Sequence, residues 1–431
     1  MASLHHVELC TANAGRLLRL FTGGYGFQRL GGRDTPRCLQ WVVRSGRATF
    51  VLTQRHAQER PGAVHDSRFT AGEPWTQFCY PSGRHQRDSV FNVALLVRDV
   101  AATVSRAARA GGHVLQRPVH VADADGAAEY AVVRSVCGNV VHTLINADRY
   151  SGPFLPGFLD SNGVSDAART PDEECEVPDI RGQESEYVDH VTLTCRRGES
   201  TGLLDWYQHV FGMRRFQLNS QDSPTDGVVM GGEVGMALKA MEYWRCAETG
   251  LQAPPTDPNQ PTLKFVVAES LHDDSHVETF NRQHGSPGVQ HIGLHTDDIV
   301  SRVAGMASRG VNFRRPPPAY YTQTGKGAEI AAAGIAGEEL SRFRQLGLLL
   351  DSEADSDTDT GDRYLMQIFS EPLFEEDTFF MEVLERRGAR GFGQGNITAL
   401  ARSIIEDQRQ RQESAGGEPG KEDCGRRAET G

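Results

Sequence analysis

Three side chains of metal-ligating type lie within strand-like, apolar segments of the second half of the chain. His190 lies in VDHVTLT, His291 in VQHIGLH and Glu382 in FFMEVLER. A carboxylate on a buried strand face is costly unless it is paired or bound to a metal. If the three strand faces meet in one barrel, two imidazoles and one carboxylate converge. Non-haem Fe(II) oxygenases use this ligand set, which leaves coordination positions open for substrate and oxygen.

The spacing of these residues leaves other interpretations open. They are far apart in the chain, so no local motif links them, and a histidine beside apolar residues is more often a core or edge residue. Zinc also accepts two histidines and a glutamate, so a zinc lyase is an alternative. The eight cysteines are scattered without a C-x-x-C pair, which disfavours a thiolate zinc site.

An internal repeat predicts the elements that position these residues. Segments 5–27 and 189–213 each have the pattern of a strand, a polar turn and an amphipathic helix. Segments 91–114 and 290–313 form a second pair, in which an aspartate precedes the helix and a glycine ends it. The predicted fold class is therefore α+β, with two tandem domains. Each domain has two β-α-β-β-β units that form an open barrel with outer helices.

The repeat also predicts how the chain is divided. A first domain is expected at 1–150, a linker at 151–185 and a second, catalytic domain at 186–409. Residues 351–362 (DSEADSDTDTGD) form an acidic insertion that lacks the glycine and glutamate of a calcium loop, so a solvated loop is predicted. The polar tail at 410–431 is predicted to be disordered.

The first domain lacks a complete set of ligands in this interpretation. The repeat aligns the three candidate ligands with His6, Asn92 and His142. None of these is a carboxylate, so only the second domain is predicted to hold a metal.

Composition excludes several classes of function. The 431 residues carry a net charge of -12, which repels phosphate backbones and disfavours a general nucleic-acid binder. No apolar run approaches the roughly 18 residues that a transmembrane helix needs. The basic, apolar segment 13–21 (NAGRLLRLF) has the pattern of a mitochondrial presequence, which predicts a mitochondrial location. Because the first strand begins near His5, a cytoplasmic location is the alternative.

The chain resembles the 4-hydroxyphenylpyruvate dioxygenase family, which has the vicinal-oxygen-chelate fold. The matching stretches are VDHVTL, GVQHIGLHTDDI, YLMQIFSEP, FFMEVLERRG and GFGQGN. The resemblance implies two vicinal-oxygen-chelate domains and one Fe(II) per chain, held by His190, His291 and Glu382. It implies that a small aromatic 2-oxo acid chelates this iron and reacts with dioxygen. It further implies a substrate pocket lined by Gln290, Gln367, Phe369, Phe380, Phe392 and Asn396.

Several pocket positions depart from the family pattern. The family's Pro-Ile-Asn-Glu stretch reads VVAE here, and its Gly-Asn-Phe stretch reads GNI. These changes remove an aromatic wall and a polar anchor, and so loosen the placement of the substrate ring. A looser ring favours hydroxylation of the benzylic carbon, which gives 4-hydroxymandelate, over attack on the ring, which gives homogentisate. The substituted positions are Val266, Ala268, Ile397, His276 and, in a looser alignment, Leu238.

Three functions follow from these observations. The first is an Fe(II) dioxygenase that forms 4-hydroxymandelate, with supply of a ubiquinone head-group precursor as a further hypothesis. The second is homogentisate formation with the same metal. The third is a non-catalytic scaffold with a relic site, which the lost pocket residues favour. Because vicinal-oxygen-chelate domains often associate, a homo-oligomer is also expected.

Overall fold

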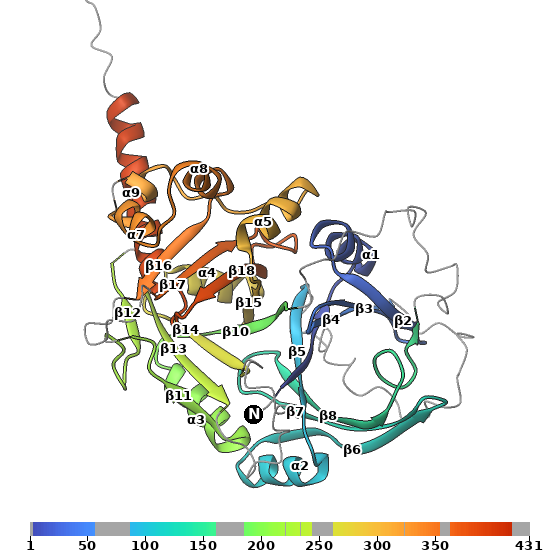
Figure 1. The fold of residues 1–431 in the computed structure, drawn as a ribbon. Helices are drawn as coiled ribbons and strands as arrows, with labels where there is room; N and C mark the ends of the chain where they lie inside the picture. The colour runs from blue at the N-terminus through green and yellow to red at the C-terminus, as the bar shows by residue number, and fades with distance from the viewer. Residues whose placement is uncertain are drawn as a thin grey trace, which may run out of the picture.

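Two curled sheets lie side by side in a computed structural model of the chain, with most helices on their outer sides (Figure 1). The structure describes residues 3–56, 87–160, 185–219, 221–232, 234–243, 262–322, 324–353 and 363–415. Most of the predicted linker, acidic insertion and tail lie outside these residues. None of the described helices is long and apolar enough to span a membrane.

The first sheet is built from two β-α-β-β-β units, as the repeat predicts. Its strand order is β6-β7-β8-β5-β1-β4-β3-β2-β9. The first unit comprises β1 (Leu4–Cys10), α1 (Ala14–Arg19) continued by the π-helix η1 (Leu20–Gly24), β2 (Gln28–Asp34), β3 (Cys38–Ser45) and β4 (Ala48–Arg55). The second comprises β5 (Ser89–Leu96), α2 (Val100–Arg109), β6 (His113–Asp123), β7 (Gly126–Arg134) and β8 (Val141–Tyr150), and is followed by β9 (Leu159–Asp160).

The second sheet repeats this plan with extra helices. Its order is β11-β13-β14-β10-β15-β18-β17-β16, with β12 paired to β13. One unit comprises β10 (Tyr187–Cys195), α3 (Ser200–Phe211), β11 (Met213–Phe216), β12 (Val228–Met230), β13 (Met236–Tyr243) and β14 (Lys264–Ser270), followed by α4 (His276–His284). The other comprises β15 (Val289–His295), α5 (Ile299–Ser308), α6 (Ala319–Thr322), α7 (Lys326–Ala332), α8 (Gly337–Leu346), β16 (Leu349–Glu353), β17 (Arg363–Phe369) and β18 (Phe380–Arg387), followed by α9 (Gln394–Ala415).

Matching caps fix the ends of the two equivalent helices α2 and α5. Asp99 Oδ1 accepts a hydrogen bond from the amide of Ala102, and Asp298 Oδ1 accepts one from the amide of Ser301. Each helix is followed by a glycine with positive φ, Gly111 at 85° and Gly310 at 88°. The caps and terminating glycines expected from the sequence are thus confirmed.

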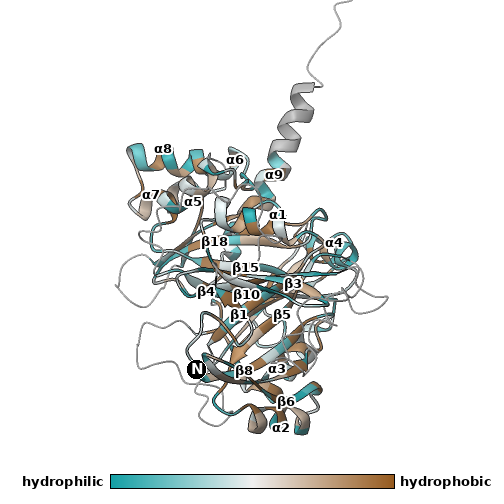
Figure 2. Ribbon diagram, turned by 90° about the vertical axis from the view of Figure 1, so that its right-hand side faces the viewer, coloured by the Kyte–Doolittle hydropathy of each residue, from teal (hydrophilic) through white to brown (hydrophobic). Residues whose placement is uncertain are grey.

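A shared hydrophobic core joins the two sheets. One cluster of buried side chains runs from Val7 and Phe50 of the first sheet to Leu193 and Phe265 of the second. Strands β1, β5 and β8 are coloured largely hydrophobic in Figure 2, as expected of strands near the middle of a sheet. The α+β fold with two duplicated domains is therefore confirmed.

Two segments at the predicted domain boundaries have defined structure. Residues 151–160, which directly follow β8, bury Phe154 and Phe158 against the first sheet, and β9 pairs with β2. Helix α9 continues past residue 409 to Ala415. The start of the predicted linker is thus packed on the first sheet, and the start of the predicted tail is helical.

Candidate metal centre and substrate cavity

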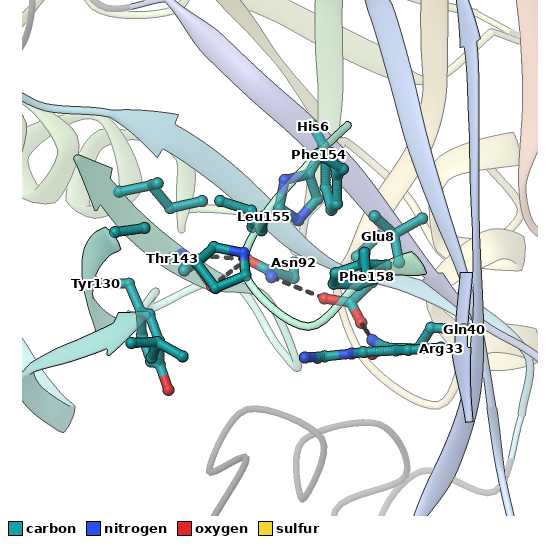
Figure 3. Close-up of a pocket in the computed structure, with 15 residues that line it drawn as sticks. His6, Glu8, Arg33, Gln40, Asn92, Tyr130, Thr143, Phe154, Leu155 and Phe158 are labelled. Atoms are coloured by element: carbon teal, nitrogen blue, oxygen red, sulfur yellow. Dashed lines mark hydrogen bonds between the residues drawn. The ribbon is translucent and has the colours of Figure 1, made fainter. Parts of the chain in front are cut away.

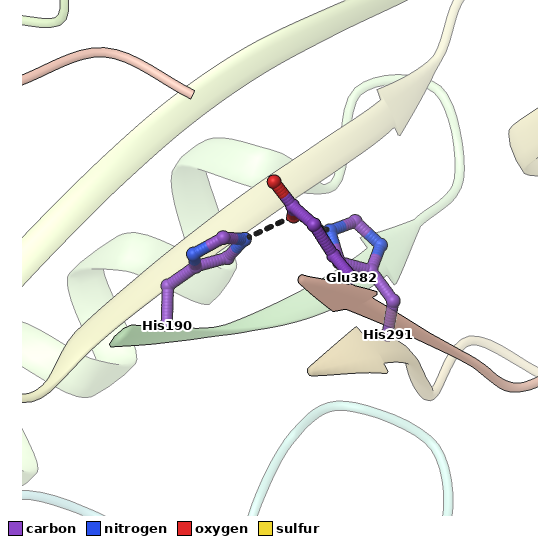
Figure 4. Close-up of side chains that lie close together, drawn as sticks. All are labelled: His190, His291 and Glu382. Atoms are coloured by element: carbon purple, nitrogen blue, oxygen red, sulfur yellow. Dashed lines mark ion pairs between the residues drawn. The ribbon is translucent and has the colours of Figure 1, made fainter. Parts of the chain in front are cut away.

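The three candidate ligands converge on the inner side of the second sheet (Figure 4). His190 is on β10, His291 on the neighbouring β15 and Glu382 on β18, next to β15. One ligand atom from each lies within 4.8 Å of the others. Glu382 Oε2 is 3.1 Å from His190 Nε2 and 3.5 Å from His291 Nε2.

Both imidazoles are oriented by the partner of their second nitrogen. Asp189 Oδ1 is 2.9 Å from His190 Nδ1, and Gln290 Oε1 is 3.2 Å from His291 Nδ1. If each Nδ1 carries the proton and donates it to that oxygen, each Nε2 keeps a lone pair that a metal can take, and that of His291 accepts a hydrogen bond of 2.9 Å from the Thr192 hydroxyl. The arrangement is the one that metal-ligating histidines need.

The surroundings shift the pKa values of the two histidines in opposite directions. Burial alone would lower the pKa of His190, but the nearby Glu382 carboxylate and its Asp189 partner raise it above its usual value. Burial, reinforced by His190, holds the pKa of His291 well below its usual value. Asp189 stays ionised because Arg386 and Lys264 outweigh its burial and hold its pKa well below the ordinary range.

Gly293 makes room for the ligand on β10. It pairs with His190 on one side and with Glu382 on the other. A Cβ at this position would lie 2.3 Å from Cε1 of the His190 ring. Only a residue without a side chain lets the imidazole lie over β15.

The polar atoms of the triad fit a bound cation. Glu382 is 2% exposed, and its Oε1 has no hydrogen-bond partner among the described residues. A buried carboxylate oxygen without a partner is costly, and a metal ion would satisfy it. Within the described residues, this is the one cluster of histidine, cysteine or acidic residues with ligand spacing. The donor set suits iron or zinc.

A largely apolar cavity of about 460 Å³ opens from this cluster. The inner strands of the second sheet and one face of α9 line it. Seven of the predicted substrate residues contribute to its lining: Val266, Ala268, Gln290, Phe369, Phe380, Phe392 and Ile397. Its volume falls in the range of small-molecule sites.

Two predicted substrate residues do not line the cavity. Gln367 is fully buried on β17, and neither atom of its amide has a hydrogen-bond partner in the described structure. Asn396, in the first turn of α9, accepts a hydrogen bond of 2.7 Å from the Tyr320 hydroxyl, while its Nδ2 lacks a partner among the described residues. These amides lie behind the cavity wall, so direct substrate contact by them stays a prediction.

The positions that depart from the family pattern gather on one wall. Leu238 pairs with Ala268 across β13 and β14, and Val266 and Phe392 belong to the same apolar cluster. Ile397 of α9 packs against this cluster. The wall therefore offers only apolar contacts to a substrate ring. His276, another altered position, lines the cavity and lies 3.3 Å from Gln290 through its Nδ1.

Comparisons with known proteins place the chain. Residues 187–336 match the Glyoxalase/Bleomycin resistance protein/Dioxygenase superfamily. The human 4-hydroxyphenylpyruvate dioxygenase-like protein is 38% identical over 413 residues, which cover 95% of this chain and 96% of the relative. The chain belongs to the 4-hydroxyphenylpyruvate dioxygenase family. The family assignment and the vicinal-oxygen-chelate fold made from the sequence are thus confirmed.

Other members of the family are similar along nearly the whole chain. The 4-hydroxyphenylpyruvate dioxygenase of Neurospora crassa is 27% identical over 94% of this chain and 91% of its own. A solved structure of a mutant 4-hydroxymandelate synthase from Streptomyces coelicolor is 25% identical, with a TM-score of 0.65. It covers 94% of this chain and 99% of that one. A 4-hydroxyphenylpyruvate dioxygenase and a 4-hydroxymandelate synthase are therefore both similar to this chain along nearly its whole length.

In the described part of the first domain, the positions equivalent to the three candidate ligands do not form a ligand cluster. Asn92 pairs with Val141, and its equivalent His291 pairs with Phe380. Glu382 lies two residues after Phe380, so its counterpart lies two residues after Val141. That counterpart is Thr143, not His142. The prediction for His142 is wrong, because a shift of one residue moves a side chain to the opposite face of the sheet. His142 instead lies 2.9 Å from the Tyr207 hydroxyl of the second domain.

The equivalent barrel interior is filled by the chain itself (Figure 3). Glu8 accepts hydrogen bonds from Gln40, Thr53 and Asn92. Phe154 and Phe158 also line this space, which leaves a cavity of only about 40 Å³. The polar groups here form hydrogen bonds with one another, and aromatic rings fill the remaining space. This explains why the described residues of the first domain form no metal-ligand cluster.

Sequence reasoning missed the residues behind and beside the triad. Period-two alternation places Arg386 on the strand face of Glu382, and Asp189 directly precedes a ligand, but no local pattern shows that these two side chains meet. Arg314 lines the cavity and forms a hydrogen bond of 2.6 Å with Asp377. No local pattern marks Arg314, because a loop places it there.

Proposed function

We propose that the chain is an Fe(II)-dependent dioxygenase that converts 4-hydroxyphenylpyruvate and dioxygen into 4-hydroxymandelate and carbon dioxide. His190, His291 and Glu382 are the proposed ligands of one Fe(II) per chain. The observation that carries the proposal is the buried, partly unpartnered Glu382 carboxylate facing two oriented imidazoles at a largely apolar cavity. Bound iron would supply Lewis acidity and the redox chemistry with oxygen.

The protein's own residues have separate roles in this proposal. Asp189 and Gln290 fix the ligand imidazoles, so that the Nε2 atoms face the cavity. Phe380 stacks on His291 at a ring distance of 4.8 Å and, with Phe369, supplies an aromatic side to the cavity. Residues Ile397, Leu400 and Ala401 of α9 close the opposite side. Exclusion of water by this lining would protect a reactive intermediate.

The apolar wall supports hydroxymandelate as the product. Leu238, Val266, Ala268 and Ile397 give the substrate ring no hydrogen-bond donor or acceptor to hold its hydroxyl group. The ring position is then set by packing, and the small side chain of Ala268 leaves it free to shift. A displaced ring presents the benzylic carbon to the metal. Homogentisate formation from the same substrate is the alternative, and similarity to a relative named 4-hydroxyphenylpyruvate dioxygenase supports the substrate in either case.

Identification of the product tests the proposal. The purified chain is loaded with Fe(II) without oxygen and then mixed with 4-hydroxyphenylpyruvate and oxygen. Because 4-hydroxymandelate and homogentisate are isomers, chromatography against both standards must accompany mass measurement. Hydroxymandelate as the main product supports the proposal. Homogentisate as the main product contradicts it and supports the alternative function. Bound iron without product from any aromatic 2-oxo acid, or no bound iron, favours the scaffold function.

Three wider roles also stay proposals. A mitochondrial location would follow from segment 13–21, and supply of ubiquinone head groups from the chemistry of the product. Fractionation of cells that express the tagged chain tests the first. Absence of label in the quinone after feeding of labelled substrate would argue against the second. The expected homo-oligomer is tested by light scattering.

A further inference from the structure

Arg386 lies between the metal centre and the start of helix α9. Its guanidinium forms a fork with Asp189, with distances of 2.8 Å from Nε to Oδ2 and 2.7 Å from Nη2 to Oδ1. Asp189 in turn holds His190 Nδ1, and both acidic and histidine side chains are buried. Arg386 is thus connected through the Asp189 side chain to His190, a proposed metal ligand.

The remaining donor of Arg386 holds the loop that leads into α9. Its Nη1 donates to the carbonyl oxygens of Gly391 at 2.6 Å and Ala389 at 3.3 Å. The guanidinium carbon lies 4.9 Å from the centre of the Phe392 ring, and the His190 ring lies 4.7 Å from the same ring. The loop is therefore fastened both to Arg386 and, through Phe392, to His190.

The loop has little freedom to move independently of this contact. Gly393 follows with φ of 73°, and a Cβ there would lie 2.2 Å from the Gln367 amide. Helix α9 begins at the next residue, and Ile397, Leu400, Ala401 and Ile404 line the cavity from its face. The seating of α9 over the cavity thus depends on where the loop is held.

We propose that Arg386 is a positioning residue that couples metal occupancy at His190 to the seating of α9 over the cavity. A metal on Nε2 makes the Nδ1 proton of His190 a stronger donor and fixes Asp189 more firmly. Asp189 then fixes the Arg386 fork, which fixes the loop and the first turns of α9. Because coupling is reciprocal, a well-seated α9 also tightens metal binding. This inference rests on the proposed metal site.

Hydrogen exchange of α9 with and without Co(II), which binds without redox turnover, tests the coupling. In the native sequence, Co(II) should slow exchange of the amides at 394–401 by about fivefold or more, the lower end of typical coupling. Arg386→Lys keeps a positive charge near Asp189 but cannot reach both the carboxylate and the loop. This variant should bind Co(II) about tenfold more weakly and show the same α9 exchange with and without the metal.

A matched control lies at the next residue. Arg387 is 58% exposed and pairs with Glu385, so Arg387→Lys should behave like the native sequence. Thermal unfolding of the metal-free variants checks that each is folded. If Arg386→Lys proves unstable, Asp189→Asn breaks the same connection and keeps an oxygen for His190.

The outcomes separate the coupling from the metal site. Metal-independent exchange of α9 in the native sequence, or full metal protection in folded Arg386→Lys, would overturn the coupling while Co(II) binding upholds the site. If exchange of α9 in Arg386→Lys is faster than in the native sequence by the same factor with and without Co(II), so that the metal still protects the helix, Arg386 has a purely structural role and the coupling is overturned. Absence of Co(II) binding in the native sequence would overturn the metal site and the coupling together.

Discussion

At the scale of single residues, the chemistry depends on small side chains as much as on ligands. Gly293 leaves space for the His190 ring, and Ala268 and Ile397 shape the wall that a substrate ring would meet. The ligands alone would fit several reactions. The neighbouring small residues decide how a ligand is oriented and where a substrate can rest.

Changing Ile397 to Phe should move the product toward homogentisate. The larger ring restores an aromatic surface on the altered wall and restricts the substrate ring. A difference of about 1.4 kcal/mol between the competing barriers changes the product ratio about tenfold. Chromatography of the two isomers measures this ratio. Val229→Phe, on β12 of the same sheet, is the matched control, because Val229 is 54% exposed and is not among the residues that line the cavity; an equal shift in both variants would contradict the argument.

Changing Gly293 to Ala should weaken metal binding. The added Cβ would lie 2.3 Å from the His190 ring, which must turn away from Glu382. Loss of ligand orientation typically costs about 10–100-fold in metal affinity. Isothermal titration with Co(II) measures it. The counterpart in the first domain is Ala94, which pairs with His6, and Ala94→Gly should leave the affinity unchanged.

At the scale of elements, helix α9 and strand β16 complete the cavity that the sheet leaves open. Asp351 at β16 accepts a hydrogen bond of 3.0 Å from the amide of Gly395, the second residue of α9, and also pairs with Lys326. Glu353 accepts hydrogen bonds from the amides of Arg390 and Gly391. Carboxylates at a helix N-terminus satisfy free amides and interact favourably with the helix dipole.

Changing Asp351 to Ala should loosen the first turn of α9. Loss of such a capping carboxylate lowers the stability of a helix by about 1 kcal/mol, which raises the equilibrium constant for local opening of its first turn about fivefold. Hydrogen exchange of the amides at 395–401 should be faster by that factor. Glu338, an exposed acid in the first turn of α8, provides the control. Unchanged α9 exchange in Asp351→Ala would show that the helix is held by its apolar face alone.

The elements could be predicted from the sequence, but their exact register could not. The repeat predicts both pairs of β-α-β-β-β units, and the DH and QHIGLH strands predict the triad. His142 is predicted on the wrong face because the first five residues of its strand are all buried, so no alternation of apolar and polar residues fixes the register there. Asp189, Arg386 and Arg314 act through contacts between distant segments, which no local periodicity records.

At the scale of the whole molecule, one copy of a duplicated barrel keeps a ligand cluster and the other is filled. The two copies also contact each other through a buried polar group. His142 Nδ1 is 2.9 Å from the carbonyl oxygen of Val93, and its Nε2 is the same distance from the Tyr207 hydroxyl. The neutral imidazole, with a proton on Nδ1, can make both hydrogen bonds at once.

Acid should weaken the contact between the domains through His142. Burial lowers its pKa to about 4 from 6.5, although its hydrogen bond to Val93 opposes this shift. The neutral form is favoured by folding, so this stability is fully present above pH 6.5 and is lost as the pH falls toward 4. A shift of this size corresponds to about 3 kcal/mol at most.

Chemical unfolding between pH 7 and 4 measures this dependence. His142→Gln should flatten the decline in stability across that window. His120, whose side chain is 78% exposed, is the control, and His120→Gln should leave the curve unchanged. An identical decline in the native sequence and in His142→Gln would mean that other buried groups cause it.

Oxygen uptake by the Fe(II)-loaded chain tests the central claim, that the triad holds a catalytic iron. An oxygen electrode records consumption before and after addition of 4-hydroxyphenylpyruvate, with Glu382→Gln prepared in the same way. We predict uptake that requires the 2-oxo acid and releases one carbon dioxide per oxygen, and none above background in Glu382→Gln. Iron-loaded protein that consumes no oxygen with any aromatic 2-oxo acid, or uptake that persists in Glu382→Gln, would contradict the account.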